Sequence, residues 1–182
     1  MRLVGAIALA IVIGSCGQAA APSPTPPANV PRGPSEVLTR HEHAHLAILV
    51  RGQIKTVPAF IGIAARQICW LHTHDTSGII HAEAGDTRTL TLGDFFAVWR
   101  QPLSETMVDG EQVGSGETIT VTVNGQATSQ PPNQVVLKNR EEIVLQLGPP
   151  FLEPQPFVWA ARVLVRRDYA PGGFPLGSSD TK

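Results

Sequence analysis

The sequence is poor in sulfur and in charge, and each shortage excludes a class of function. Of its 182 residues, two are cysteine and two are methionine. Met107 is the only methionine beyond the initiator, a poor supply of the thioether ligands that a Cu(I) carrier needs. Charged residues make up 16% of the chain, and the formal net charge is −1. That balance lacks the basic excess typical of proteins that bind nucleic acid or an anionic membrane surface.

The N-terminus has the features of an export signal. Arg2 precedes an apolar run, Leu3 to Ile13, that is too short to span a bilayer comfortably. The residues Ile13-Gly14-Ser15-Cys16 resemble the lipobox of bacterial lipoproteins. The resemblance implies a signal peptide at residues 1–15 and a lipid on Cys16. That lipid would anchor the protein to the outer face of the bacterial membrane or in the periplasm. An ordinary secretory signal and an uncleaved anchor are the alternatives.

Composition divides the rest of the chain into a tether, one domain and a tail. Residues 16–35 are rich in proline and alanine, so we expect an extended tether. Residues 36–167 have the length of one domain, and residues 168–182 are expected to be disordered. With Cys16 lipidated, Cys69 has no partner for an intramolecular disulfide. Cys69 is then a buried filler, a metal ligand or a reactive thiol.

All six histidines lie between residues 41 and 81. One cluster is His41-Glu42-His43-Ala44-His45, and the second, between Cys69 and Glu83, contains His72, His74 and His81. If protonated together these imidazoles would repel one another, and if buried and neutral each would need a partner. A shared metal ion removes both costs. We therefore interpret the clusters as a metal site, with separate structural histidines as the alternative.

The turn signal Thr76-Ser77-Gly78 predicts a β-hairpin from Trp70 to Glu83. A loop of two or four residues would pair His72 with His81, His74 with Ile79 and Trp70 with Glu83. Opposed side chains then have Cβ atoms about 4.5–5.5 Å apart, close enough for two imidazoles to bind one cation. A loop of three or five residues would separate them.

A strand from Arg40 to Val50 would direct the odd-numbered histidines of the first cluster to one face and apolar side chains to the core. A second hairpin is expected at Arg51-Gly52. Asp75 is also typical of an Asx turn, and Glu83 of an acceptor that orients a histidine N–H. The predicted ligands are His43, His45, His72, His74 and His81, and the further candidates for ligation or support are His41, Glu83, Asp75 and Cys69.

The remaining pattern predicts a mainly β fold: a small single-domain β-sandwich, or a β-grasp-like sheet of hairpins, with one short helix. Thr91 and Asp94 have capping-box spacing before an apolar stripe at helical periodicity, which predicts a helix over about 91–100 that ends before Pro102. The Asn124-Gly125 pair predicts a hairpin turn. Further strands are expected at Thr87–Thr91, Thr118–Val123, Val135–Leu137, Ile143–Leu147 and Phe157–Val165.

The motifs between His43 and Trp99, H-x-H-L, V-P-A-F-I-G-I, C-W-L-H-T-H-D-T-S-G-I-I-H-x-E and T-L-G-D-F-F-x-x-W, resemble an uncharacterised family of secreted or lipid-anchored bacterial and archaeal proteins. That resemblance implies an exported small domain and brings no activity. L-H-T-H-D-T-S-G is also similar to the first motif of polymerase-and-histidinol-phosphatase-type metallophosphoesterases, but their barrel needs downstream ligands and no histidine follows His81. Cys69-x-x-His72 is similar to part of a blue-copper loop, without its axial methionine.

Imidazole ligands suit Zn(II) or Cu(II), and Fe(II) or Mn(II) would suit the site if Glu83 or Asp75 coordinates. We expect an envelope lipoprotein that binds close to one transition-metal ion, copper or zinc, for capture, delivery or storage. The first alternative is a small metalloenzyme with an open His-ligated site and Glu83 as its base. The second is a structural ion in a domain that binds another envelope protein. Nucleic acid is not an expected partner.

Overall fold

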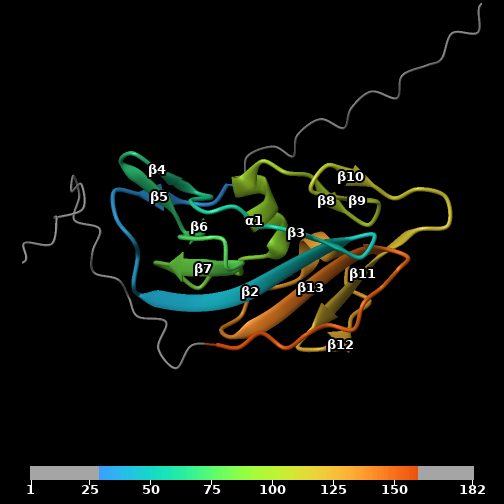
Figure 1. The fold of residues 1–182 in the computed structure, drawn as a ribbon. Coiled ribbons are helices and arrows are strands. Elements are labelled where there is room, and N and C mark those ends of the chain that lie inside the picture. Colours follow the sequence, from blue (N-terminus) through green and yellow to red (C-terminus); the bar gives the residue numbers. More distant parts are fainter. Residues whose placement is uncertain (1–28, 160–182) are drawn as a thin grey trace, which may run out of the picture.

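The computed structural model describes residues 29–159, and the fold is mainly β, as the sequence predicts. Its largest sheet has seven strands, and two smaller sheets have three each (Figure 1). The large sheet runs in the order β12 (Gln126–Ala127), β11 (Thr118–Val123), β13 (Glu141–Gly148), β2 (Arg40–Val50), β7 (Ile79–Ala84) and β6 (Leu71–His72), with β3 (Gln53–Lys55) also paired to β2. The small sheets are β1 (Arg32–Gly33), β5 (Gln67–Cys69) and β4 (Ile63–Ala64), and β10 (Glu111–Gln112), β9 (Met107–Val108) and β8 (Leu103–Ser104).

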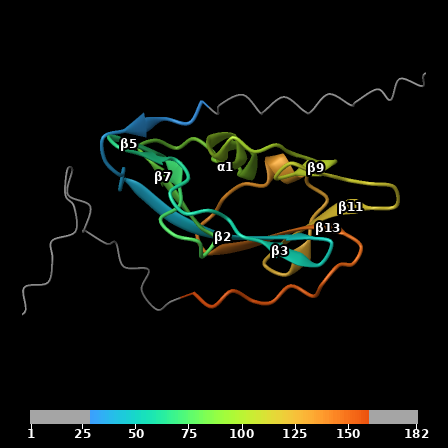
Figure 2. The same ribbon diagram turned by 45° about the horizontal axis from the view of Figure 1, so that its top comes forward.

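The large sheet separates two layers. Helix α1 (Leu92–Trp99) and the two small sheets lie on one side of it, and the extended segment 149–159 runs along the other (Figure 2). On the helix side, alternate residues of β2 from Ala44 to Val50 are buried and join one core with Leu92, Phe95 and Phe96. The other face of β2 carries the histidines, so the predicted division of this strand between core and site is confirmed.

Strand β2 is the longest strand of the described residues, and it lies inside the large sheet with neighbours along both edges. It is antiparallel to β7 and parallel to β13, which begins only at Glu141. The hairpin signals of the sequence do not predict this parallel pairing. Hairpin signals identify antiparallel neighbours, whereas a parallel neighbour comes from a long crossover that leaves no turn signal.

The two turn pairs and the capping box form the turns and the helix start that the sequence predicts. The turns Arg51-Gly52 and Asn124-Gly125 have positive φ at both central residues and connect β2 to β3 and β11 to β12. Thr91 and Asp94 form a complete capping box at the start of α1. The helix ends at Trp99 and is capped by Arg100, which has a left-handed backbone and whose N–H donates to the last turn, two residues before Pro102.

Three expected strands differ in the structure. The segments Thr87–Thr91 and Val135–Leu137 contribute only an isolated bridge between Thr91 and Val136. Leu92 N–H donates to Val135 O, so the second segment crosses the start of α1 together with the 3₁₀ helix η1 (Pro132–Gln134) and does not extend a sheet. Residues 157–159 do not form a strand, and Phe157 N–H donates to the Glu142 side chain. The rest of the expected strand Phe157–Val165 lies outside the described residues.

The described fold begins before the Glu36 boundary that composition suggested. Val30 is buried, and β1, within the expected tether, pairs with β5. Trp70 N–H also donates to the carbonyl of Pro31. The signal peptide at 1–15, Cys16, the first part of the tether and the tail at 168–182 lie outside the described residues.

No helix within residues 29–159 is long and apolar enough to cross a membrane.

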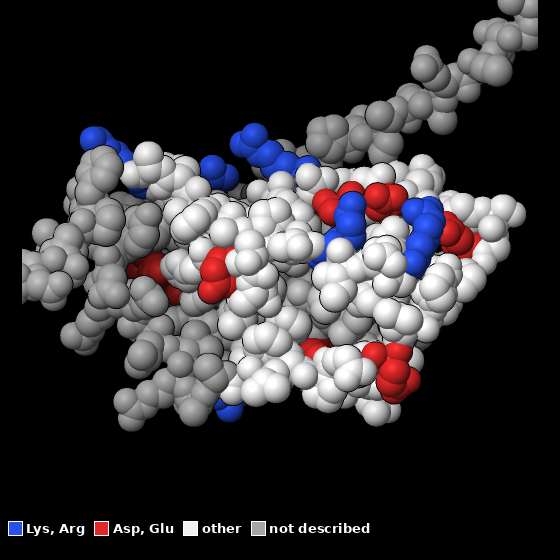
Figure 3. All heavy atoms as spheres, viewed as in Figure 1, with Lys and Arg blue, Asp and Glu red and all other residues white. Residues whose placement is uncertain are grey.

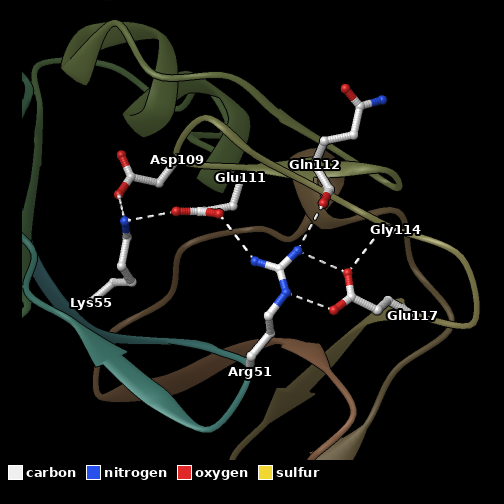
Figure 4. Close-up of polar contacts among 7 residues, drawn as sticks. All are labelled: Arg51, Lys55, Asp109, Glu111, Gln112, Gly114 and Glu117. Atoms are coloured by element: carbon white, nitrogen blue, oxygen red, sulfur yellow. Dashed lines mark hydrogen bonds and ion pairs between the residues drawn. The ribbon is translucent and has the colours of Figure 1, made fainter.

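A network of ion pairs attaches the β2–β3 hairpin to the sheet of β8, β9 and β10 (Figure 4). The Arg51 guanidinium donates to both oxygens of Glu117, at 2.6 and 2.9 Å, and to Glu111 at 3.2 Å. Lys55 also contacts Glu111, at 3.2 Å. These residues form the mixed acidic and basic group at the right of the space-filling view (Figure 3). Because the guanidinium is shared between two carboxylates in a bidentate geometry, the network positions the hairpin better than an isolated surface pair would.

The loop after β6 docks on β2 through Gly78. Its carbonyl accepts a hydrogen bond of 2.9 Å from Leu46 N–H. Gly78 has a φ of +82°, and a Cβ added there would collide with the Leu46 carbonyl oxygen. Glycine is therefore required both for the left-handed backbone and for the close approach of the loop to β2.

We predict that Gly78→Ala lowers the free energy of unfolding by about 2–4 kcal/mol, since backbone strain adds to the collision. The matched control is Gly125→Ala, because Gly125 has a φ of +75° with nothing within 4 Å of an added Cβ. That control should cost only about 1–2 kcal/mol of backbone strain. Urea unfolding of both variants measures the difference, and equal losses would contradict the tight docking of the loop.

Candidate metal centre

The histidine face is assembled by the register of three adjacent strands. His43 on β2 lies directly opposite His81 on β7, and His81 lies opposite His72 on β6. His41 lies opposite Glu83, two residues along the ladder between β2 and β7. The predicted pairing of His72 with His81 is therefore confirmed. The structure adds β2 as the third strand of the row.

Five of the six imidazoles converge on this row. His41 Nε2 lies 3.0 Å from His43 Nε2, and His72 Nε2 lies 3.2 Å from His74 Nε2. The His81 ring stands between these two pairs, with its centroid 4.4 Å from that of His43 and 4.4 Å from that of His74. Strand β6 ends at His72, so His74 reaches the cluster from the following loop and is not paired with Ile79 in a ladder.

Glu83 is the carboxylate at the centre of the cluster. Its Oε1 lies 3.2 Å from His41 Nε2, 3.5 Å from His81 Nδ1 and 4.0 Å from His72 Nε2. The side chain is 1% exposed, and neither oxygen accepts a well-formed hydrogen bond from the described residues. A buried carboxylate without a well-formed hydrogen bond is costly, so Glu83 and the surrounding imidazoles form a group that could hold a cation.

A second carboxylate, Glu36, was not among the candidates from the sequence. Its Oε1 lies 3.2 Å from His74 Nε2 and 3.8 Å from His72 Nε2. Glu36 belongs to the loop between β1 and β2, where no periodicity relates it to the later hairpin. The only available signal was that it is the first acidic residue of the chain, five positions before His41.

Hydrogen bonding determines which nitrogen His72 presents to the cluster. Its Nδ1 lies 2.9 Å from the carbonyl oxygen of Cys69, and a carbonyl can only accept, so Nδ1 carries the proton. The neutral ring then directs the Nε2 lone pair at His74 and the two carboxylates. A hydrogen bond that orients the imidazole in this way is usual for a metal ligand.

Cys69 supports this arrangement through its backbone, and its thiol is not part of any group of close potential ligands among the described residues. The thiol is buried, and burial raises its pKa. Of the three roles considered for Cys69, the structure supports the buried filler.

His45 and Asp75 lie apart from the groups of converging ligands. His45 faces Ile79 across the ladder, and its ring stacks on Phe157 at 3.8 Å between centroids and 13° between planes. Asp75 Oδ1 accepts a hydrogen bond of 2.8 Å from Ser77 N–H, which is the Asx turn considered as its alternative role. The structure thus brings in His41, which was a secondary candidate, and separates His45, which was a primary one.

The electrostatics favour unprotonated imidazoles. The pKa of each of His43, His72 and His81 is lowered to about 3, first by burial and then by neighbouring imidazoles. The pKa of Glu83 is raised to about 7, first by burial and then by Glu36. At neutral pH these three rings are therefore neutral, and their lone pairs are available to a metal ion.

The distances in the cluster fit coordination. Two donors bound to one ion at about 2.0–2.1 Å with a tetrahedral angle lie about 3.3–3.4 Å apart, and less at smaller angles. The spacings of 3.0–3.2 Å in the histidine pairs are slightly shorter and fit an angle at the ion somewhat below the tetrahedral value. Three groups of donors, each with ligand atoms within 4.8 Å of one another, could hold an ion: His41, His43 and His81; His72, His74 and His81; and Glu36, His72 and Glu83.

Comparison of the chain with protein-family models, with curated proteins and with solved structures finds no match.

The metal-free protein should lose stability as the pH falls below about 6.5, because the three histidines of low pKa bind protons only after unfolding. Glu83 acts oppositely: its raised pKa contributes stability that is complete below about pH 4.5 and is lost as the pH rises through about 7. We therefore predict that Glu83→Gln stabilises the metal-free protein by about 1–2 kcal/mol at pH 8.

Urea unfolding in the presence of EDTA at pH 8 and pH 6 measures both effects, in the range where the loss from the histidines is still small. The gain from Glu83→Gln should be smaller at pH 6, where folded Glu83 is mostly protonated. A variant that is less stable than the wild type at pH 8 would contradict the burial of an unsatisfied charge at this position.

Proposed function

We propose that the protein is an exported, lipid-anchored module that captures a transition-metal ion, copper or zinc, at the cell envelope and holds it for delivery or storage. The observation that carries the proposal is the convergence of five imidazoles, three of which lie within 4.0 Å of the buried Glu83 carboxylate. These side chains come from three strands and a loop, and no core packing requires donors at this place.

A metal ion accounts for the composition of the cluster better than a purely structural role. His81 Nδ1 and both Glu83 oxygens are buried without a well-formed hydrogen bond from the described residues. Unsatisfied polar atoms are uncommon in native proteins and usually have a functional reason. A bound cation would satisfy all three atoms at once.

The exposure of the ligands supports capture and release. Glu83 and His72 are 1% and 0% exposed, whereas the side chains of Glu36 and His74 are 22% and 37% exposed. One end of the cluster is therefore closed by the sheet, and the other opens to solvent at Glu36 and His74. An ion could enter and leave at that end without disrupting the ladder.

The ligand chemistry supports Cu(II) or Zn(II). Imidazole nitrogens dominate the cluster, and these two ions suit such nitrogen donors. Met107 is buried in β9, which belongs to a separate sheet, so its thioether is not a member of the cluster. The resemblance of residues 13–16 to a lipobox supports placement at the membrane surface through Cys16, in a part of the chain outside the described residues.

One observation favours a small metalloenzyme as the second candidate. A carboxyl group whose pKa is about 7 can both accept and donate a proton near neutral pH, and Glu83 has this property beside a site with an open end. In that case an ion would keep a coordination position for water, and Glu83 would act as general base. A carrier releases its ion to a competing chelator in folded form, whereas an enzyme turns over a substrate with the ion retained.

We predict that His43→Ala weakens Zn(II) or Cu(II) binding at least tenfold, because it removes one of the converging imidazoles. His45→Ala is the matched control, since it deletes the same side chain two residues along the same strand, outside the groups of close ligands. It should leave the affinity within about twofold of the wild type. Competition with a chromophoric chelator measures the affinity of the full chain, purified without a histidine tag.

Two results would contradict the proposal. If the wild-type chain neither copurifies with a transition metal nor takes up Zn(II) or Cu(II), as measured by elemental analysis, metal binding is excluded as its function. If His45→Ala weakens binding as much as His43→Ala, the ion is held by a different set of side chains.

A further inference from the structure

The cluster has more donors than one ion uses. A structural zinc ion takes four protein ligands, and a catalytic one takes three and a water. Here five imidazoles and two carboxylates belong to the groups of close ligands: Glu36, His41, His43, His72, His74, His81 and Glu83. The remaining donors are numerous enough to bind a second ion.

The donors are divided between two sides of His81. The pair His41 and His43 comes from β2, and the pair His72 and His74 comes from β6 and its following loop. The His81 ring belongs to the ligand group of each pair. Among the described residues, no group of mutually close donors contains a member of both pairs. A single ion bound by one pair would therefore leave the other pair free.

Glu83 lies where a carboxylate shared between two ions would lie. Its Oε1 is 3.2 Å from His41 Nε2 on one side and 4.0 Å from His72 Nε2 on the other. Both of its oxygens are buried and lack a well-formed hydrogen bond from the described residues. In two-metal sites the ions are about 3.5–4 Å apart, a separation that the two oxygens of one carboxylate span.

We infer that the cluster is a two-ion centre with the Glu83 carboxylate between two transition-metal ions of the copper or zinc type. This inference rests on the proposed function and deepens it. The first ion is held by His41 and His43, and the second by His72, His74 and Glu36. His81 stands between them, within reach of either ion. The negative charges of Glu36 and Glu83 offset part of the repulsion between two divalent ions.

The two ions differ in access to solvent. The second ion would lie at the open end of the cluster, where the His74 side chain is 37% exposed and Glu36 is 22% exposed. The first would lie beside His41, whose side chain is 16% exposed, and Glu83, which is 1% exposed. The second ion should therefore exchange with a chelator faster than the first.

The test is to strip the full chain of metal, load it with Cu(II), and determine copper per chain by elemental analysis and magnetic coupling by electron paramagnetic resonance. We expect two Cu(II) ions per chain and the dipolar splitting and half-field signal of ions about 4 Å apart. Loading with Zn(II) should likewise give two ions per chain. The protein carries no histidine tag, so all binding comes from its own residues.

Paired variants locate each ion. Glu36→Ala combined with His74→Ala removes only partly exposed side chains, and it should leave one Cu(II) per chain with the spectrum of an isolated ion. His41→Ala combined with His43→Ala should also leave one, held by the other pair. His45→Ala is the control and should retain two coupled ions.

The outcomes separate this inference from the proposed function. One magnetically isolated Cu(II) per wild-type chain would overturn the two-ion centre and leave metal binding intact. No bound Cu(II) or Zn(II) would overturn both. Two Cu(II) ions without coupling would overturn the placement of Glu83 between them, and two ions retained in either paired variant would overturn the assignment of their ligands.

Discussion

The register of β7 between β2 and β6 is the constraint on which the site depends. It places His81 opposite His43 on one side and opposite His72 on the other. On the reverse face the same register brings Ala44 opposite Ile80, and Leu71 opposite Ala82, all of them buried. A slip of one residue would expose this apolar set and turn the histidines into the core. Burial of one face therefore maintains the alignment of ligands on the other.

The cluster occupies the end of β2 where the sheet is narrower. Strand β13 pairs with β2 only from Ala44 to Val50, whereas the ladder with β7 runs from Arg40 to His45. Neutral imidazoles and a buried Glu83 are costly in the absence of a cation, and His41 and His43 lie on the part of β2 that β13 does not reach. The other end of β2 is stabilised by its parallel pairing with β13 and by the Arg51 network (Figure 4).

Periodicity and turn residues predicted the parts of the site that are local in sequence. They identified the histidine face of β2, the pairing of His72 with His81 and the capped helix α1. They could not predict the register between β2 and β7. That register places His41 opposite Glu83 and His45 opposite Ile79, and the His45 ring stacks on Phe157. Glu36 was missed for a related reason: loop residues follow no period, so only tertiary structure brings its carboxylate to His74.

Some of the candidate ligands lie on strands and others on loops, and this difference bears on the proposed function. His41, His43, His72, His81 and Glu83 are on strands, where ladder hydrogen bonds hold the backbone. Glu36 and His74 are on loops at the solvent end of the cluster. Movement of either loop would remove ligands from a bound ion while the strand register and the apolar core stay unchanged. Opening the site would not require opening the fold, so the proposed transfer of an ion would cost well below the free energy of unfolding. A site whose ligands all came from strands would hold its ion until the sheet itself opened.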